Sequence, residues 1–481
     1  MSLEQFDSSS LFDKITTEGR NSKYQIYIHL NAFSAMLIQG FELNTYPILI
    51  IPIKKYFNFS EITNSFCVAI IFLGFALGSS ISGYLTSYLG RIKVLKTCSL
   101  IFLVFHFIMS FFLEEIIFFI CRFIIGFALG IHIPIMINLL GEYVPSNSRG
   151  FRLQLIYAFF AIGPLFMVIV SLFIMPQLET YQLRKVLLIC ELLPLLSFIV
   201  NFFFLFDSPR HMIIRGNKEQ AFEILENMNN GKLSNDEKDE IIKEINSSWA
   251  NANIKENEVS IFDLFQPKYY STSIILIIED FVAAVGCFGI AIVVTLSQHA
   301  LNLEASIVDN HSILLSELMV HIFDLFSTFV SAFLIENKNL GRKGSLMLSL
   351  GFQFTLAIPT IHIRSFFSIL NATVLFFVNI SSNILVAYIV EVYPTKIRDL
   401  SSGFHFMITM FSGLISQFLF LGASYINFRL PYYLLSFTCL LACVFAYLLP
   451  YETRGKHLDM NMTLGEDLVD ENNHGNYVLI D

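Results

Sequence analysis

Apolar residues gather in long blocks along the chain, and polar residues are mostly confined to the short stretches between the blocks. A membrane helix needs about 20 predominantly apolar residues, and twelve blocks reach that length. They run from Ile26 to Ile53, Ile62 to Gly83, Val94 to Leu113, Ile116 to Leu140, Leu153 to Met175, Val186 to Phe206, Ser273 to Leu296, Ser312 to Ile335, Ser345 to Ile363, Phe366 to Val390, Ser401 to Gly422 and Pro431 to Leu449. The pattern predicts an all-α membrane protein with twelve transmembrane helices.

A longer polar stretch separates the sixth block from the seventh and divides the chain into two sets of six. We expect a tail over residues 1–24, a six-helix bundle over 25–206, a linker with short helices over 207–271, a second six-helix bundle over 272–450 and a second tail over 451–481. The first tail has no basic segment followed by an apolar one, so no cleaved signal peptide is expected.

Lys and Arg are unevenly divided between the two ends of the predicted helices. The short loops at the linker end hold eleven of these residues, and the loops at the other end hold six. Because basic loops stay on the cytoplasmic side, we expect the linker and both tails to be cytoplasmic. The plasma membrane is the expected location. An endosomal or vesicular membrane is the alternative, because Tyr477 to Ile480 resembles a tyrosine-based sorting signal.

The composition excludes several classes of function. Hydrophobic residues make up 55% of the chain and charged residues 14%, whereas soluble domains carry roughly 25% charged residues. The net charge of -9 comes largely from the linker and the second tail, and no basic block indicates nucleic-acid binding. The seven cysteines show no CxxC spacing, and no nucleophile set or phosphate loop is visible. We therefore expect no metal site, no cofactor and no enzyme activity.

Two motifs recur in the second half of the chain. A Glu, a Pro and an Arg, with spacings of three and four residues, follow the fourth block and again the tenth, as Glu142, Pro145 and Arg149 and as Glu391, Pro394 and Arg398. A Gly-Arg pair follows the second block at Gly90 and Arg91 and the eighth at Gly341 and Arg342. Tight basic loops converge on such residues, but the nearly constant offset favours a duplication. It predicts two parallel, pseudo-symmetric halves.

These loops resemble conserved motifs of the major facilitator superfamily, in its sugar porter-like group. Gly83 to Lys93 is similar to GxLxDxxGRK, with Ser87 in place of the Asp. The fourth block with Arg122 matches the pattern of that helix in the family, and Glu391 to Arg398 matches ExYPTxxR. The resemblance implies the major facilitator fold and transport by alternating access. It also implies a cytoplasmic gate formed by Gly83, Gly90, Arg91, Glu142, Arg149, Gly341, Arg342, Glu391 and Arg398.

The seventh block separates the chain from typical sugar carriers. It lacks their QQxxGxN pattern and carries Glu279 and Asp280, followed by Phe288-Gly289-Ile290, as in the synaptic vesicle and organic ion transporter branch. Asp324 also lies where that branch has an acidic residue. Met410, in contrast, occupies the place of the branch's Arg in the eleventh helix.

Glu42 lies in the middle of the first predicted helix, where sugar porters carry an Asp. A charged carboxylate at that depth is costly unless it is paired, and the resemblance implies Arg122 as its partner. We expect Glu42 to accept a proton, release Arg122 and so couple proton movement to transport. A static structural ion pair is the alternative.

Glu317, His321 and Asp324 are spaced four and three residues apart, so they share one face of the eighth predicted helix. We expect this face, Asp280 and the amides of Asn379 and Asn383 to line a substrate cavity with acidic character. A mutually satisfied polar seam is the alternative for the three residues of the eighth helix. His132 and His405 are expected to be satisfied core histidines.

These residues together predict a transporter of a small polar organic solute, with an organic cation as the candidate class and proton coupling through Glu42 and Arg122. A sugar, polyol or vitamin carrier is one alternative, and a receptor or trafficking protein with a transporter fold is another. The expected partners are the solute, protons and the bilayer, and we expect a monomer.

Overall fold

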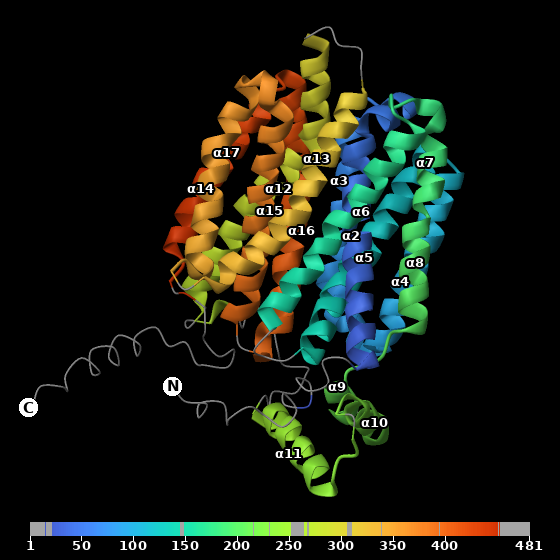
Figure 1. Cartoon of the computed structure of the whole chain (residues 1–481), viewed down its shortest axis with the longest axis vertical. Helices are drawn as coiled ribbons and strands as arrows, with labels where there is room; N and C mark the ends of the chain where they lie inside the picture. Colours follow the sequence, from blue (N-terminus) through green and yellow to red (C-terminus); the bar gives the residue numbers. More distant parts are fainter. Residues whose placement is uncertain are drawn as a thin grey trace, which may run out of the picture.

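The computed structural model describes residues 15, 22–144, 149–214, 216–229, 231–251, 264–266, 269–304, 310–337, 339–393, 395–450 and 452. Within them, twelve spans are long and apolar enough to cross a membrane, which confirms the predicted fold class. Figure 1 shows the spans as two groups of long helices side by side, with the linker helices at one end. That end is called the linker side below, and the other end the opposite side.

The first group contains α2 (Lys23–Phe57), α3 (Glu61–Leu89), α4 (Arg91–Phe111), α5 (Glu115–Tyr143), α6 (Arg149–Ile174), α7 (Leu183–Cys190) and α8 (Leu192–Phe203). A short 3-10 turn, η3 (Thr180–Gln182), precedes α7. The sixth span is thus two helices that meet at Glu191, where one continuous helix was expected. Pro194 explains the break, because it has no N–H to donate to the carbonyl of Cys190.

The linker holds α9 (Pro209–Ile214), α10 (Lys218–Met228) and α11 (Asn235–Asn251). The second group contains α12 (Tyr270–Glu304), α13 (His311–Glu336), α14 (Gly341–His362), α15 (Phe367–Val392), α16 (Thr395–Ile426) and α17 (Leu430–Leu448), with η6 (Arg364–Phe366) before α15. Several helices extend beyond the apolar blocks. The helix α12, for example, continues to Glu304, past the last apolar residue of its block.

Close helix contacts in the first group are made by glycines that face neighbouring backbone. A Cβ on Gly130 of α5 would lie 2.1 Å from the carbonyl oxygen of Phe75 in α3, and a Cβ on Gly40 of α2 would lie 1.8 Å from that of Phe160 in α6. Small residues allow such approach in membranes, where helix association depends on packing and not on exclusion of water. These pairs fix α2, α3, α5 and α6 around the interior of the first half.

The helix α2 is kinked near its opposite-side end. It contains Pro47 and Pro52, and Leu49 between them has non-helical angles of φ -99° and ψ 16°. Proline removes a helical hydrogen bond and its ring crowds the preceding turn, which accounts for the kink.

Hydrogen bonds join the two halves near both ends. On the opposite side, Asn64 Nδ2 donates to Tyr425 Oη at 2.8 Å. On the linker side, Gln154 Nε2 donates to the carbonyl oxygen of Asn383 at 2.8 Å, and Ser331 Oγ donates to Gln154 Oε1 at 3.3 Å. The structure therefore shows a conformation in which the halves touch above and below the interior.

Candidate functional site

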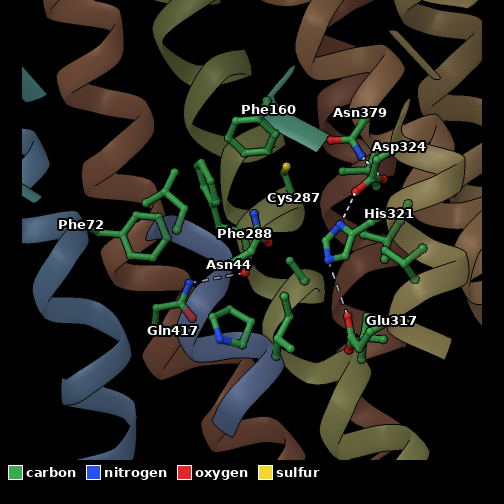
Figure 2. A pocket seen from close by; sticks show the side chains of 18 residues that line it. Asn44, Phe72, Phe160, Cys287, Phe288, Glu317, His321, Asp324, Asn379 and Gln417 are labelled. Carbon is green, nitrogen blue, oxygen red and sulfur yellow. Dashed lines mark hydrogen bonds and ion pairs between the residues drawn. The ribbon is translucent and has the colours of Figure 1, made fainter. Parts of the chain in front are cut away.

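A cavity lies between the two halves, and both contribute to its wall. Figure 2 shows its residues: Leu43, Asn44, Pro47 and Ile48 of α2, Phe72 of α3, Phe160 of α6, Cys287, Phe288, Ala291 and Val294 of α12, Glu317, Val320, His321 and Asp324 of α13, Leu375, Val378 and Asn379 of α15, and Gln417 of α16. Both groups of helices therefore supply side chains to one shared space.

The acidic row of α13 faces this cavity, as the helical spacing predicted. His321 lies between the two carboxylates, with Nδ1 3.1 Å from Asp324 Oδ2 and Nε2 3.9 Å from Glu317 Oε2. Figure 2 shows the three side chains in a line along one wall. Asn379 Nδ2 donates to the second oxygen of Asp324, and Thr295 Oγ1 donates to Glu317 Oε1 at 2.6 Å. The row is therefore hydrogen-bonded to α12 and α15 and also exposed to the cavity.

Two residues predicted for the cavity do not line it. Asp280 is buried between α12 and α16, where Thr409 Oγ1 donates to it at 2.9 Å and His405 Nδ1 lies 3.3 Å away. Asn383 lies one turn below Asn379 on α15, and its main-chain oxygen accepts the bond from Gln154. Both therefore serve helix contacts. His405 is a core histidine as predicted, but it is only half satisfied: Asp280 is the partner of its Nδ1, and its Nε2 has no hydrogen-bond partner among the described residues.

Aromatic rings form the wall that faces the acidic row. Phe72 and Phe288 meet edge to face with ring centroids 5.0 Å apart, and Phe160 lies near them in Figure 2. Aromatic faces attract cations, and carboxylates do so more strongly. The amide of Gln417 adds a polar group next to the rings, since its Nε2 donates to the carbonyl oxygen of Phe288 at 3.3 Å. The cavity thus combines carboxyl groups with apolar rings.

Glu42 lies inside the first half and away from the cavity wall. Its side chain is fully buried, and neither carboxylate oxygen has a hydrogen-bond partner among the described residues. His106 Nε2 lies 4.0 Å from Glu42 Oε1, while His106 Nδ1 lies 2.5 Å from Glu191 Oε1. Ser110 Oγ also donates to Glu191 at 3.0 Å. A second histidine between two carboxylates therefore exists here.

Arg122 is fully buried near Glu42 but makes no ion pair within 4.0 Å with any described residue. Its Nε donates to the carbonyl oxygen of Cys67 at 3.2 Å, and its guanidinium stacks over the Tyr46 ring at 5.3 Å. The direct pair expected between Glu42 and Arg122 is thus not formed in this conformation, because the guanidinium turns toward α3. His106 takes that place beside Glu42.

Sequence reasoning missed His106 and Glu191. Both are ionisable residues inside predicted membrane helices, and that property alone marks candidates for function. Their grouping with Glu42 could not be predicted, because it depends on how α4 and the α7–α8 break pack against α2.

Most contacts of the predicted gate residues that the structure describes lie in the second half. Arg342 pairs with both oxygens of Glu391, through Nε at 2.9 Å and Nη2 at 2.8 Å. Glu452 accepts from the backbone N–H groups of Arg342 and Lys343 at 2.7 and 2.9 Å. Gly341 has φ +61°, and a Cβ there would lie 2.5 Å from the Glu452 carboxylate.

The first-half counterpart of the gate is only partly visible. Gly83 lies within α3, and Gly90, with φ 86°, separates α3 from Arg91 at the start of α4. The side chains of Glu142, Arg149 and Arg398 lie outside the described residues.

Comparisons with known proteins agree with this architecture. The profile of the family described as sugar (and other) transporter matches residues 11–463. Synaptic vesicle 2-related protein of Xenopus laevis is 26% identical over 424 residues, which cover 84% of this chain and 75% of that protein. Organic cation/carnitine transporter 7 of Arabidopsis thaliana is 23% identical over 484 residues, which cover 92% and 95%. Niacin transporter NiaP of Acinetobacter baylyi is 25% identical over 399 residues, which cover 82% and 86%.

Among solved structures, the partially occluded inward open conformation of the xylose transporter XylE from E. coli superposes with a TM-score of 0.71 at 18% identity, covering 89% of this chain and all of that one. This likeness concerns the fold. The relatives confirm the predicted resemblance to the synaptic vesicle and organic ion transporter branch. The chain therefore belongs to the sugar (and other) transporter family of the major facilitator superfamily and is a multi-pass membrane transporter of a solute.

Proposed function

We propose that the protein moves a small organic cation across the membrane by alternating access and couples this movement to protons. The observation that carries the proposal is the placement of Glu317 and Asp324 on one wall of the cavity, opposite Phe72 and Phe288. A cation bound there would meet two carboxylates on one side and aromatic rings on the other. His321 lies between the two carboxylates on the same wall.

Proton coupling is assigned to Glu42, with Arg122 as the fixed charge nearby. Burying an ionised carboxylate without a hydrogen bond costs free energy, so charging and discharging Glu42 changes the energy of the first half. Its position away from the cavity lets a proton bind without competing directly with the solute.

A vitamin or sugar carrier is the second candidate. The amides of Asn44, Asn379 and Gln417 lie in the same cavity and can bind neutral polar groups. The relatives include a protein named as a niacin transporter and, by fold, a xylose transporter. An uncharged solute would leave the two carboxylates of α13 without a direct role, and this favours the cation.

We place the linker and both chain ends in the cytoplasm and assign the linker-side motifs to the gate between the two moving halves, 25–206 and 272–450. A vesicular membrane is a candidate alongside the plasma membrane, because relatives are named as synaptic vesicle 2-related proteins.

The test uses purified protein in liposomes with an internal pH dye while organic cations, sugars and vitamins are added outside in turn. We expect proton movement with cations that is lost in Glu42→Gln and kept in Glu61→Gln, a surface carboxylate that pairs with Lys54. Tracer uptake without proton movement would overturn the coupling. Uptake of sugars or vitamins alone would select the second candidate. Silence in both assays would favour a receptor or trafficking role.

A further inference from the structure

Thr295 lies where one helix of the first half meets two helices of the second. Its Oγ1 is 3.0 Å from the carbonyl oxygen of Pro47 in α2 and 2.6 Å from Glu317 Oε1 in α13. All three residues are buried. Thr295 and Pro47 lie in the last third of their helices, on the opposite side from the linker, and Pro47 adjoins the kink of α2. The contact therefore joins the moving halves above the cavity.

The number of hydrogens available decides which of the two contacts is a hydrogen bond. A hydroxyl has one hydrogen, and a carbonyl or an ionised carboxylate only accepts. When Glu317 is ionised, Thr295 donates to one acceptor, and the negatively charged carboxylate is the stronger one. When Glu317 is protonated, its own O–H donates to Thr295 Oγ1 and the Thr295 hydrogen is free for Pro47. Only the protonated form makes both bonds at once.

We propose that Thr295 is a proton-dependent latch that closes the opposite side of the transporter. Protonation adds one O–H at Glu317 and turns the Thr295 hydrogen toward Pro47, which holds the halves together. Ionisation of Glu317, or its pairing with a cation, turns that hydrogen back to the carboxylate and releases α2. The proposal rests on the proposed function in that Glu317 belongs to the solute cavity, and it adds a link from that cavity to the opposite-side closure.

The charge of Glu317 is set by a small group of neighbours. His321 Nε2 lies 3.9 Å away on the same helix, and the carboxylate of Asp324 lies one turn further along. Asp324 and, from α17, the phenol of Tyr432 interact electrostatically with Glu317. The other contacts named here, Thr295 and Pro47, are uncharged.

Native Cys287 provides the reporter, because it lines the cavity. Sealed vesicles with the linker enclosed are treated from outside with a small polar methanethiosulfonate reagent, which then reaches Cys287 only through the opposite side. The Cys287→Ser variant gives the background from the other cysteines. Each rate is divided by that of Thr295→Val at the same pH, because thiols themselves react more slowly at low pH.

We expect this ratio to fall about two- to tenfold between about pH 8 and about pH 5 in the native protein, the worth of one net hydrogen bond. Thr295→Ser, which keeps the hydroxyl, should behave like the native chain. Glu317→Gln should give a low ratio at every pH, because its amide always donates to Thr295. A ratio that does not change with pH in the native protein, or a profile in Thr295→Ser unlike the native one, would overturn the latch.

The readout requires neither a transported solute nor a proton flux. A normal latch profile in a protein that moves no cation would leave the latch in place and remove the proposed function. Proton-coupled cation transport with a flat Cys287 ratio would remove the latch alone.

Discussion

Each half of the molecule holds a histidine near two carboxylates, but the two sets differ in what they face. In the second half, Glu317, His321 and Asp324 come from one helix and line the cavity. In the first half, the set is Glu42 of α2, His106 of α4 and Glu191 at the junction of α7 and α8, and none of the three lines the cavity. The same chemistry is therefore open to a solute in one half and closed to it in the other.

This difference suggests a division of roles within the proposed cycle. The three residues that line the cavity can discriminate among solutes. The three residues enclosed in the first half can exchange protons but cannot contact a solute. Packing supports the division. Glycines of the first half meet the backbone of neighbouring helices directly, whereas Gly289 and Gly413 of the second half meet the side chains of Phe420 and Phe72. The first half has the less adaptable interior.

The largest expected effect is on solute affinity, and it distinguishes a carboxylate that lines the cavity from one that does not. Asp324→Asn should weaken binding of a radiolabelled quaternary ammonium ion by about 30-fold or more, because truncating a buried charge partner costs about 2–5 kcal/mol. Asp280→Asn, a buried carboxylate outside the cavity, should change the affinity less than about twofold. Equal losses in the two variants, measured by equilibrium binding, would show that the cavity carboxylate has no special role.

The next prediction concerns the packing of the first half. Gly130→Ala places a methyl group against the Phe75 carbonyl and should lower the free energy of unfolding by about 1–3 kcal/mol. Gly351→Ala on α14, where a Cβ meets nothing within 4 Å, is the matched control and should be neutral. Thermal unfolding in detergent measures both. Similar losses would mean that the close approach of α3 and α5 contributes little.

A third prediction tests the enclosed set. His106→Gln removes the group that lies between Glu42 and Glu191, so we expect the pH dependence of transport to shift while cation affinity stays within about twofold. His321→Gln should change affinity and pH dependence together, because that ring lines the cavity. Transport rates across a pH series, alongside equilibrium binding, provide the comparison. A loss of affinity in His106→Gln with an unchanged pH profile would contradict the division of roles.

The smallest expected effect lies at the linker side. Glu452→Gln should weaken the two bonds at the start of α14 and lower the free energy of unfolding by about 1 kcal/mol, since an amide oxygen is a weaker acceptor than a carboxylate. Solute affinity should not change, because Glu452 is remote from the cavity. Urea or thermal titration checks the first expectation, and an altered affinity would show that the gate and the cavity are coupled.

Much of the architecture could be predicted because membrane spans depend on local composition. The apolar blocks gave the twelve helices, and the spacing of Glu317, His321 and Asp324 gave their common face. Side-chain contacts between helices were harder to predict, since they depend on how each helix is rotated about its axis and on how far it is shifted along it. Asp280 was expected to face the cavity but turns toward α16. Arg122 was expected to pair with Glu42 but turns toward α3. Residues from separate helices, such as Glu42 and His106, could be grouped only in three dimensions.

The contacts between the two halves have one more consequence, which concerns how such a protein can diversify. Gln154 bonds to the main-chain oxygen of Asn383, and Thr295 reaches that of Pro47. A main-chain acceptor persists whatever side chain the residue carries. The side chain at position 47, which lines the cavity, can therefore be exchanged during evolution while the moving parts still meet, so a new solute preference need not cost the protein its ability to cycle.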